Sequence, residues 1–155
     1  MHDDIDYQIL ELLQSDARLS NAAIAEQVGL TTSTVFERVK KLEKKGVIRR
    51  YVAIVDGTAV GKSITAFVRL VIGTAAGDDY VESKRQFTEG CIQEPDVLEC
   101  HTVAGEDCYV LKVRATSPQD LELLLERIRS YAPIVRSTSS IVLSTIKEET
   151  KISLA

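Results

Sequence analysis

Basic and hydroxyl side chains suited to binding a nucleic acid are concentrated between residues 31 and 50. This segment holds seven Lys and Arg residues against two acidic ones, an excess of five, whereas the whole chain has a formal net charge of −4. DNA responds to the local potential rather than to the net charge, because ammonium and guanidinium groups pair with nearby phosphates. The segment therefore predicts contact with double-stranded DNA.

Each candidate DNA contact has a plainer alternative. Hydroxyls at a helix N-terminus bind phosphate, but one of them also serves as the N-cap. The planar fork of Arg38 fits guanine and makes it the best candidate for base readout, whereas lysines suit phosphate. A basic helix face is usually only solvated. Here a Gly turn before the helix and short predicted strands after it (a wing) favour DNA binding over this plainer alternative. The predicted DNA-binding residues are Thr31, Thr32, Ser33, Thr34, Arg38, Lys40, Lys41, Lys44, Arg49 and Arg50. No aromatic residue interleaves these bases, which disfavours a stacking platform for single strands.

A second group of polar residues falls in a predicted turn at residues 104–107. Gly105 allows the backbone to approach a small ligand, and exposed amides there would hold a carboxylate. Glu106 or Asp107 would pair with an amino group. These are the two ends of an amino acid, although a Gly-Glu-Asp sequence is also a good turn without any ligand.

The cysteines and histidines do not match a metal or catalytic pattern. Cys91, Cys100 and Cys108 are odd in number and contain no CxxC pair, and a zinc site would need more ligands than nearby His101. We expect free thiols, no metal and no cofactor. No nucleophile elbow, P-loop or Rossmann fingerprint occurs, so we do not expect an enzyme. His101 is expected to pack or to contact another subunit.

Three short helices are predicted to position the basic segment. The first spans residues 4–14, and the second is capped by Ser20 and ends at Gly29. The third begins within residues 31–34 and ends at Gly46, and short strands at 47–48 and 52–55 would form a wing. Two helices around a Gly turn, the second of them basic, are typical of a winged helix-turn-helix that places a helix in the major groove.

The pattern changes after residue 62. Ser117 and Pro118 begin a helix as N-cap and first residue. The order is β-α-β-β-α-β, a ferredoxin-like unit, with strands at 64–72, 97–103, 108–115 and 134–146 and helices at 78–90 and from 118. The expected class is α+β, with a DNA-binding domain at 1–55, a linker at 56–62 and a second domain at 63–155. Helices cover one face of such a sheet, so we expect a dimer or larger assembly.

The bulk composition agrees with a folded protein. Hydrophobic residues make up 45% and charged residues 27% of the chain, which is ordinary for a globular protein. No apolar run reaches the length of a membrane helix, and the first residues are acidic, unlike a signal peptide. We expect a cytoplasmic protein without membrane contact.

The whole pattern resembles the Lrp/AsnC family of transcriptional regulators. The resemblance rests on the stretches Asp6–Leu10, Asp16–Ser20, Ile24–Leu30, Arg38–Ile48 and Ala104–Tyr109. It implies homodimers that assemble further, for example to an octamer, and a small effector bound between subunits. The implied effector residues are Ala104, Gly105, Glu106, Asp107 and Cys108, with Ser139 and Ser140 from a neighbouring subunit. Family members often have Asp where this chain has Cys108.

The sequence therefore favours a DNA-binding regulator modulated by an amino acid. The alternative is a small-molecule sensing module whose N-terminal helices contact protein rather than DNA, since a fold alone does not define a function. An enzyme with a ferredoxin-like core is weaker still, because no acid and base pair supports it.

Overall fold

The computed structural model describes residues 3–74 and 79–154, and the chain divides into two units that we treat separately. The first unit contains the residues up to Ile54 together with those from Lys147 onward. The second contains Val55–Ile146. The observed grouping differs from the boundaries drawn on the sequence by placing residues 56–62 with the second unit and the final segment with the first.

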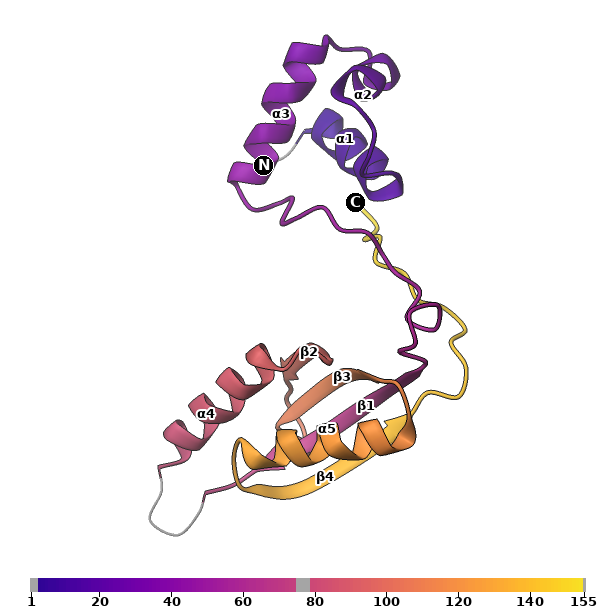
Figure 1. Ribbon diagram of the computed structural model, residues 1–155. Helices are drawn as coiled ribbons and strands as arrows, with labels where there is room; N and C mark the ends of the chain where they lie inside the picture. The colour runs from indigo at the N-terminus through magenta and orange to yellow at the C-terminus, as the bar shows by residue number, and fades with distance from the viewer. Residues whose placement is uncertain (1–2, 75–78, 155) are drawn as a thin grey trace. The chain divides into compact units, whose positions relative to one another are not determined.

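The first unit is built on three helices, α1 (Asp4–Ser15), α2 (Asn21–Val28) and α3 (Thr32–Lys44) (Figure 1). Asp3, Ser20 and Thr31 act as N-caps, and each side chain accepts a hydrogen bond from the amide three residues later. Gly29, with a φ of 70°, ends α2 as predicted. The fully buried core consists of Ile9, Ile24, Val35 and Leu42.

The predicted strands of the wing were wrong. Residues 47–48 and 52–55 are not in strands. The amides of Val47 and Ile48 both donate to the carbonyl of Leu42, so they close the end of α3 instead of entering a ladder. Val52, Ile54 and Val55 are exposed and no strand of the described residues pairs with them, because none runs beside them.

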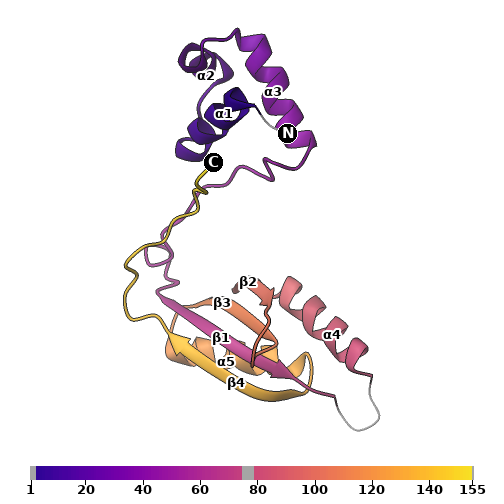
Figure 2. The same ribbon diagram turned by 180° about the vertical axis from the view of Figure 1, so that it is seen from behind.

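The C-terminal segment packs on α1. The side-chain amide of Gln14 donates to the Ile152 carbonyl, and its oxygen accepts from the Ile152 amide at 2.7 Å. Leu154 packs against the core of the three helices. The yellow end of the chain lies beside α1 in both Figure 1 and Figure 2. Residues from Lys147 onward are therefore part of the first unit.

The second unit contains a four-stranded antiparallel sheet in the order β2-β3-β1-β4, which confirms the ferredoxin-like prediction. Helix α4 begins at Tyr80, and the predicted start at Asp78 lies outside the described residues. The last strand ends at Ile141, before the predicted residue 146. In chain order the elements are β1 (Ile64–Ile72), α4 (Tyr80–Gln93), β2 (Val97–Thr102), β3 (Tyr109–Ala115), α5 (Pro118–Ser130) and β4 (Ile134–Ile141).

Both helices cover the same face of this sheet. Phe87 of α4 and Leu124 and Ile128 of α5 pack with the inward residues of β1 and β3. In Figure 1 α5 lies in front of the sheet, and in Figure 2 the sheet lies in front of α5. Alternate residues of β1, such as Phe67 and Arg69, point to the opposite face and are exposed. The structure thus leaves one sheet face without a helix, as the sequence predicted.

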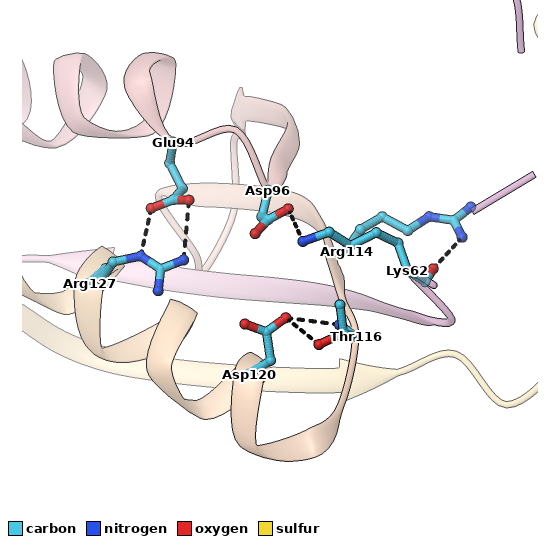
Figure 3. A network of polar contacts seen from close by, with 7 residues as sticks. All are labelled: Lys62, Glu94, Asp96, Arg114, Thr116, Asp120 and Arg127. Atoms are coloured by element: carbon cyan, nitrogen blue, oxygen red, sulfur yellow. Dashed lines mark hydrogen bonds and ion pairs between the residues drawn. The ribbon is translucent and has the colours of Figure 1, made fainter. Parts of the chain in front are cut away.

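The segment before β1 is folded onto the second unit. Residues 57–62 form a turn in which the Lys62 amide donates to the Gly57 carbonyl at 2.7 Å. The Lys62 ammonium pairs with Asp96 at 2.6 Å, and the Arg114 guanidinium donates to the Lys62 carbonyl (Figure 3). The same guanidinium occupies the space that a side chain at Gly57 would need. The residues predicted as a linker are therefore anchored to the sheet.

A second part of this network joins the two helices of the second unit. Glu94, which is only 7% exposed, follows α4 and accepts two hydrogen bonds from Arg127 of α5 (Figure 3). The Tyr131 hydroxyl donates to the same carboxylate. Arg127 holds the pKa of Glu94 below its ordinary value, although burial opposes this. Asp120, shown in the same view, caps the start of α5 by accepting from the amide and hydroxyl of Thr116.

Candidate functional site

The outer face of α3 carries an exposed row of bases. Val35, Val39 and Leu42 point into the core, so the opposite side of the helix faces solvent. Lys40, Lys41 and Lys44 are exposed there. Within residues 3–74 and 79–154 the structure gives none of these lysines an ion pair. Their charges therefore remain available to an outside anion.

The hydroxyl run at the start of α3 is organised by Thr31. Its side-chain oxygen accepts from the Thr34 amide and lies 3.1 Å from the Ser33 hydroxyl and 2.8 Å from that of Thr34. Thr31 is thus the cap, as one of the four was expected to be. Thr32, Ser33 and Thr34 are exposed at the positive end of the helix dipole, where a phosphate is stabilised.

Arg38 lies in a different environment from the lysines. Its guanidinium donates to Asp3 at 2.7 Å and to Asp6 at 2.7 Å, and its side chain is 30% exposed. These hydrogen bonds raise the pKa of Arg38, with Asp3 as the larger cause. The pKa of Asp3 is lowered, first by the Asp6 amide and then by Arg38. The predicted base reader therefore joins α3 to the beginning of α1 in this structure.

An aromatic residue on this face was not predicted from the sequence. Phe36 is 48% exposed on α3, and the Lys40 ammonium lies 5.7 Å from its ring centroid. The expectation that no aromatic residue accompanies the bases was wrong. Helical spacing provides the signal, because Phe36 follows the buried Val35 and cannot share its inward direction. An exposed ring at this place suits apolar contact with a thymine methyl group.

The bases after α3 lie on the segment that follows the helix. Arg49 and Arg50 are exposed beyond the helix end, outside any strand. The next residue, Tyr51, donates from its hydroxyl to Glu43 at 3.0 Å. Burial, and secondarily this carboxylate, raises the pKa of Tyr51 to about 12. The phenol therefore stays protonated and ties the segment carrying both arginines back to α3.

The hairpin between β2 and β3 is the second candidate site. Gly105 has a φ of 138°, which residues with a side chain rarely adopt, and the space where a Cβ would stand is open. Ala104 and Glu106 are exposed, and Asp107 and Cys108 are half-buried. The Cys108 carbonyl closes the turn by accepting from Val103, and its amide donates to Leu70 of β1.

Two arginines at this hairpin were not identified from the sequence. Arg136 of β4 donates to the Glu106 carbonyl at 2.9 Å and to the Asp107 carboxylate at 3.0 Å. Arg69 of β1 lies 4.0 Å from the same carboxylate. The available signal was a single Arg within the apolar strand 64–72, which marks a residue on the uncovered sheet face. Asp107 is therefore already ion-paired within one chain.

Ser139 and Ser140 lie near the end of β4. Their strand partners are Val68 and Phe67 of β1, whereas the hairpin begins beside Leu70, which pairs with Tyr109. The structure of one chain therefore does not bring these serines to their own hairpin. Ser140 and Phe67 share the uncovered face of the sheet, where a neighbouring subunit would meet them.

His101 lies on β2 and has an acidic neighbour. His101 is exposed on the uncovered face beside Glu99, 3.2 Å away. In the part of the chain that the structure describes, no three His, Cys, Asp or Glu residues are grouped to hold a metal ion. Across residues 3–74 and 79–154, every helix is too short or too polar to cross a membrane.

Two protein-family models together match most of the chain. A model described as winged helix-turn-helix DNA-binding matches residues 2–49. A model described as Lrp/AsnC ligand binding domain matches residues 65–152, which includes the hairpin and the uncovered sheet face. The first match covers the three helices, and the second covers the sheet and its helices and extends into the C-terminal segment that packs on α1.

Individual proteins match over nearly the whole chain. The HTH-type transcriptional regulator LrpA of Mycobacterium tuberculosis is 38% identical over 143 residues, covering 92% of this chain and 91% of the relative. The crystal structure of an AsnC family transcriptional regulator from Agrobacterium tumefaciens has a TM-score of 0.88 at 32% identity and covers 98% of this chain and 97% of that one. A transcriptional regulator from Neisseria meningitidis, solved in complex with L-methionine, has a TM-score of 0.89 at 30% identity and covers 99% and 97%.

Proposed function

The chain belongs to the Lrp/AsnC family of transcriptional regulators, and on that basis we propose that α3 reads DNA and that the sheet unit assembles subunits and binds an amino acid. Members of this family are regulators of transcription and not enzymes, so the chain is a DNA-binding regulator without a catalytic role. We expect it in the cytoplasm, where its DNA is.

The observation that carries the DNA proposal is the exposed basic row on α3. Lys40, Lys41 and Lys44 are exposed on the side opposite the core, and Thr32 and Ser33 stand at the dipole end of the same helix. Lysines at such positions bind phosphates and set the register of the helix in the major groove. Exposed Phe36 and the hydroxyls then face the base edges, and Arg49 and Arg50 contact the flanking backbone.

The uncovered sheet face supports a homodimer as the basic assembly. Phe67 is 42% exposed on this face, and it lies on β1 between Ala66 and Val68, which are buried on the side of the helices. Burying such a face against a second copy follows from the hydrophobic effect. A two-fold dimer presents two α3 helices, so it recognises a palindromic site with matching half-site spacing. Dimers of this kind then associate to a higher oligomer such as an octamer.

The hairpin is the proposed effector site. The open backbone at Gly105 leaves room for a ligand carboxylate, and Glu106 or Asp107 would pair with its ammonium group. The related Neisseria regulator was solved with L-methionine, which supports an amino acid as the ligand class. Ser139 and Ser140 would come from a neighbouring subunit, since one chain keeps them apart from its own hairpin.

The test is the salt dependence of DNA binding by the intact protein. We expect tight binding to a fragment of a regulated promoter and weaker binding to random DNA of the same length, measured by fluorescence anisotropy. The logarithm of affinity should fall with the logarithm of salt by about 0.9 for each phosphate contacted. Equal affinity for both fragments, or no salt dependence, would contradict the proposal. Either result would favour the alternative in which the N-terminal helices bind protein rather than DNA.

The effector is tested by thermal unfolding with each standard amino acid. A ligand that binds only the folded protein raises the unfolding temperature, and the rise grows with the logarithm of ligand concentration above the Kd. We expect one or a few amino acids to raise it, and Gly105→Val to abolish the rise because the backbone there needs a positive φ. The absence of a rise with every amino acid would indicate a regulator that does not use this ligand class.

A further inference from the structure

Two of the cysteines meet where α4 packs on the edge of the sheet. Cys91 lies on α4, is 3% exposed, and belongs to the same core cluster as Leu111 of β3. Cys100 lies on β2 and pairs directly with Leu111. Directly paired residues of neighbouring strands point to the same face, so the Cys100 side chain projects toward the helices, as buried Leu111 does. Helix α4 packs against β2, which brings the two thiols within hydrogen-bonding reach of each other.

The two thiols differ in access and acidity. Cys100 is exposed and Cys91 is buried. The hydrogen bond from Cys91 lowers the pKa of Cys100 to about 7, and the charge of His101 acts in the same direction. The same bond and burial raise the pKa of Cys91. Because the thiolate is the reactive form of cysteine, solvent oxidants meet the reactive member of the pair first.

We propose that Cys91 and Cys100 form a reversible intramolecular disulfide on exposure to hydrogen peroxide, which makes this pair an oxidation site of the sheet unit. The Cys100 thiolate attacks one peroxide oxygen, the O–O bond breaks, and the leaving hydroxide takes a proton to become water. Cys100 is then a sulfenic acid. The Cys91 sulfur attacks the Cys100 sulfur, the S–O bond breaks, and the departing hydroxide leaves as a second water with the Cys91 proton.

The bond would fasten the edge strand of the sheet to a helix. The closed ring contains only the end of α4, the turn carrying Glu94 and Asp96, and the first half of β2. β2 continues from Cys100 into the hairpin, so the bond restrains the strand that leads to that turn. A cross-link that fits the folded geometry stabilises the folded state, and the oxidised protein should unfold at a higher temperature than the reduced protein.

The experiment treats the reduced full-length protein with hydrogen peroxide, blocks remaining thiols with N-ethylmaleimide under denaturing conditions, and maps peptides by mass spectrometry. The reduced protein has three thiols to alkylate, and we expect only Cys108 to be alkylated after oxidation. The peptides containing Cys91 and Cys100 should be joined and should lack the mass of two hydrogen atoms. Dithiothreitol should restore both thiols and the original unfolding temperature.

Three variants distinguish this pair from other outcomes. Cys108→Ser should form the bond as the parent does. In Cys91→Ser the reaction should stop at a Cys100 sulfenic acid, which dimedone traps. Cys100→Ser, a change at an exposed position, should lose both the bond and the peroxide-induced rise in unfolding temperature. A bond from Cys100 to Cys108, a Cys100 bond between two chains, or direct conversion of Cys100 to a sulfinic acid in the parent would each overturn the proposal.

Discussion

The outer face of α3 and the hairpin after β2 differ in how far their charged groups are engaged within one chain. Lys40 and Lys44 on α3 are exposed and have no ion pair among the described residues. At the hairpin, Asp107 is bound by Arg136 and approached by Arg69. The first surface can accept an anion as it stands, whereas the second must exchange an internal ion pair for a ligand.

The α3 surface can therefore bind in the form it already has, whereas binding at the hairpin replaces an internal ion pair with a contact to the ligand. Binding to the exposed lysines costs little reorganisation, since their partner before DNA arrives is water and salt. Binding at Asp107 first requires the loss of its ion pair with Arg136 and of the longer contact with Arg69, and the ligand must replace them. Arg38 is like Asp107 of the hairpin and unlike the lysines of α3, because its guanidinium is already bound within the chain, by Asp3 and Asp6.

Removing the exposed bases should have the largest effect. We expect the triple replacement of Lys40, Lys41 and Lys44 by Ala to weaken DNA binding several hundredfold at about 0.1 M salt, since three phosphate contacts are lost. The slope of log affinity against log salt should become shallower by about 2.7. Fluorescence anisotropy across a salt series measures both, with Lys84→Ala on α4 as the control. An unchanged slope would mean that α3 does not contact phosphate.

Arg38 provides the next test. It either positions α3 or reads guanine, and these two roles predict opposite effects on DNA binding when Asp3 and Asp6 are replaced. If Arg38 positions α3, then replacing Asp3 and Asp6 together by Asn should lower the unfolding temperature by a few degrees and weaken DNA binding roughly tenfold, as Arg38→Ala does. If Arg38 reads guanine, the same double replacement releases it and should strengthen binding. We expect the first result, measured by thermal unfolding and by anisotropy on matched and mismatched sites.

At the hairpin, Arg136→Ala should strengthen effector binding about fivefold to tenfold. The variant frees Asp107 and the Glu106 carbonyl from the guanidinium that a ligand must otherwise displace. Arg69→Ala should have a smaller effect, since its distance to Asp107 is 4.0 Å. Titration of the effector by calorimetry measures both variants. Weaker binding by Arg136→Ala would contradict the exchange, and a larger effect of Arg69→Ala would make Arg69 the main partner of Asp107.

Phe36 should contribute modestly to sequence preference. We expect Phe36→Ala to reduce discrimination against a single base change about threefold to tenfold, with little change in the salt slope, because apolar contact with a base does not release counterions. Phe36→Leu should retain most of the preference. If Phe36→Ala changed the salt slope as much as a lysine variant does, the role of Phe36 would be to position Lys40 rather than to contact a base.

The smallest expected effect is the pH dependence of the Arg38 pair. The pKa of Asp3 is lowered in the folded protein from its ordinary 3.8, so the pair stabilises the fold above that pH and its contribution is lost as the pH falls through the folded value. The difference in unfolding temperature between the wild type and Arg38→Ala should be constant from about pH 5 to 8 and narrow below about 4. A difference that grew on acidification would contradict the pairing.

Local rules predicted the local features of this fold. The caps at Ser20 and Ser117, the Gly turn at Gly29 and the alternation of β1 each depend on neighbours within a few residues, and the structure confirms them. The partners of Arg38 and Asp107 could not be predicted in this way, since they lie 35 and 29 residues away along the chain. The absent wing strands have the same origin, because a strand depends on a partner that no local pattern specifies.

The packing of Leu154 on the first unit has a consequence for the order in which the protein is made. Domains generally fold as units as they leave the ribosome, the N-terminal one first. Here the helices synthesised first complete their packing only after all of Val55–Ile146 has been synthesised and Ile152 can reach Gln14. The three DNA-binding helices therefore lack their contacts with the C-terminal segment until the sheet unit has been synthesised. The helix unit containing α3 is complete only in chains that already contain the sheet proposed to form the dimer.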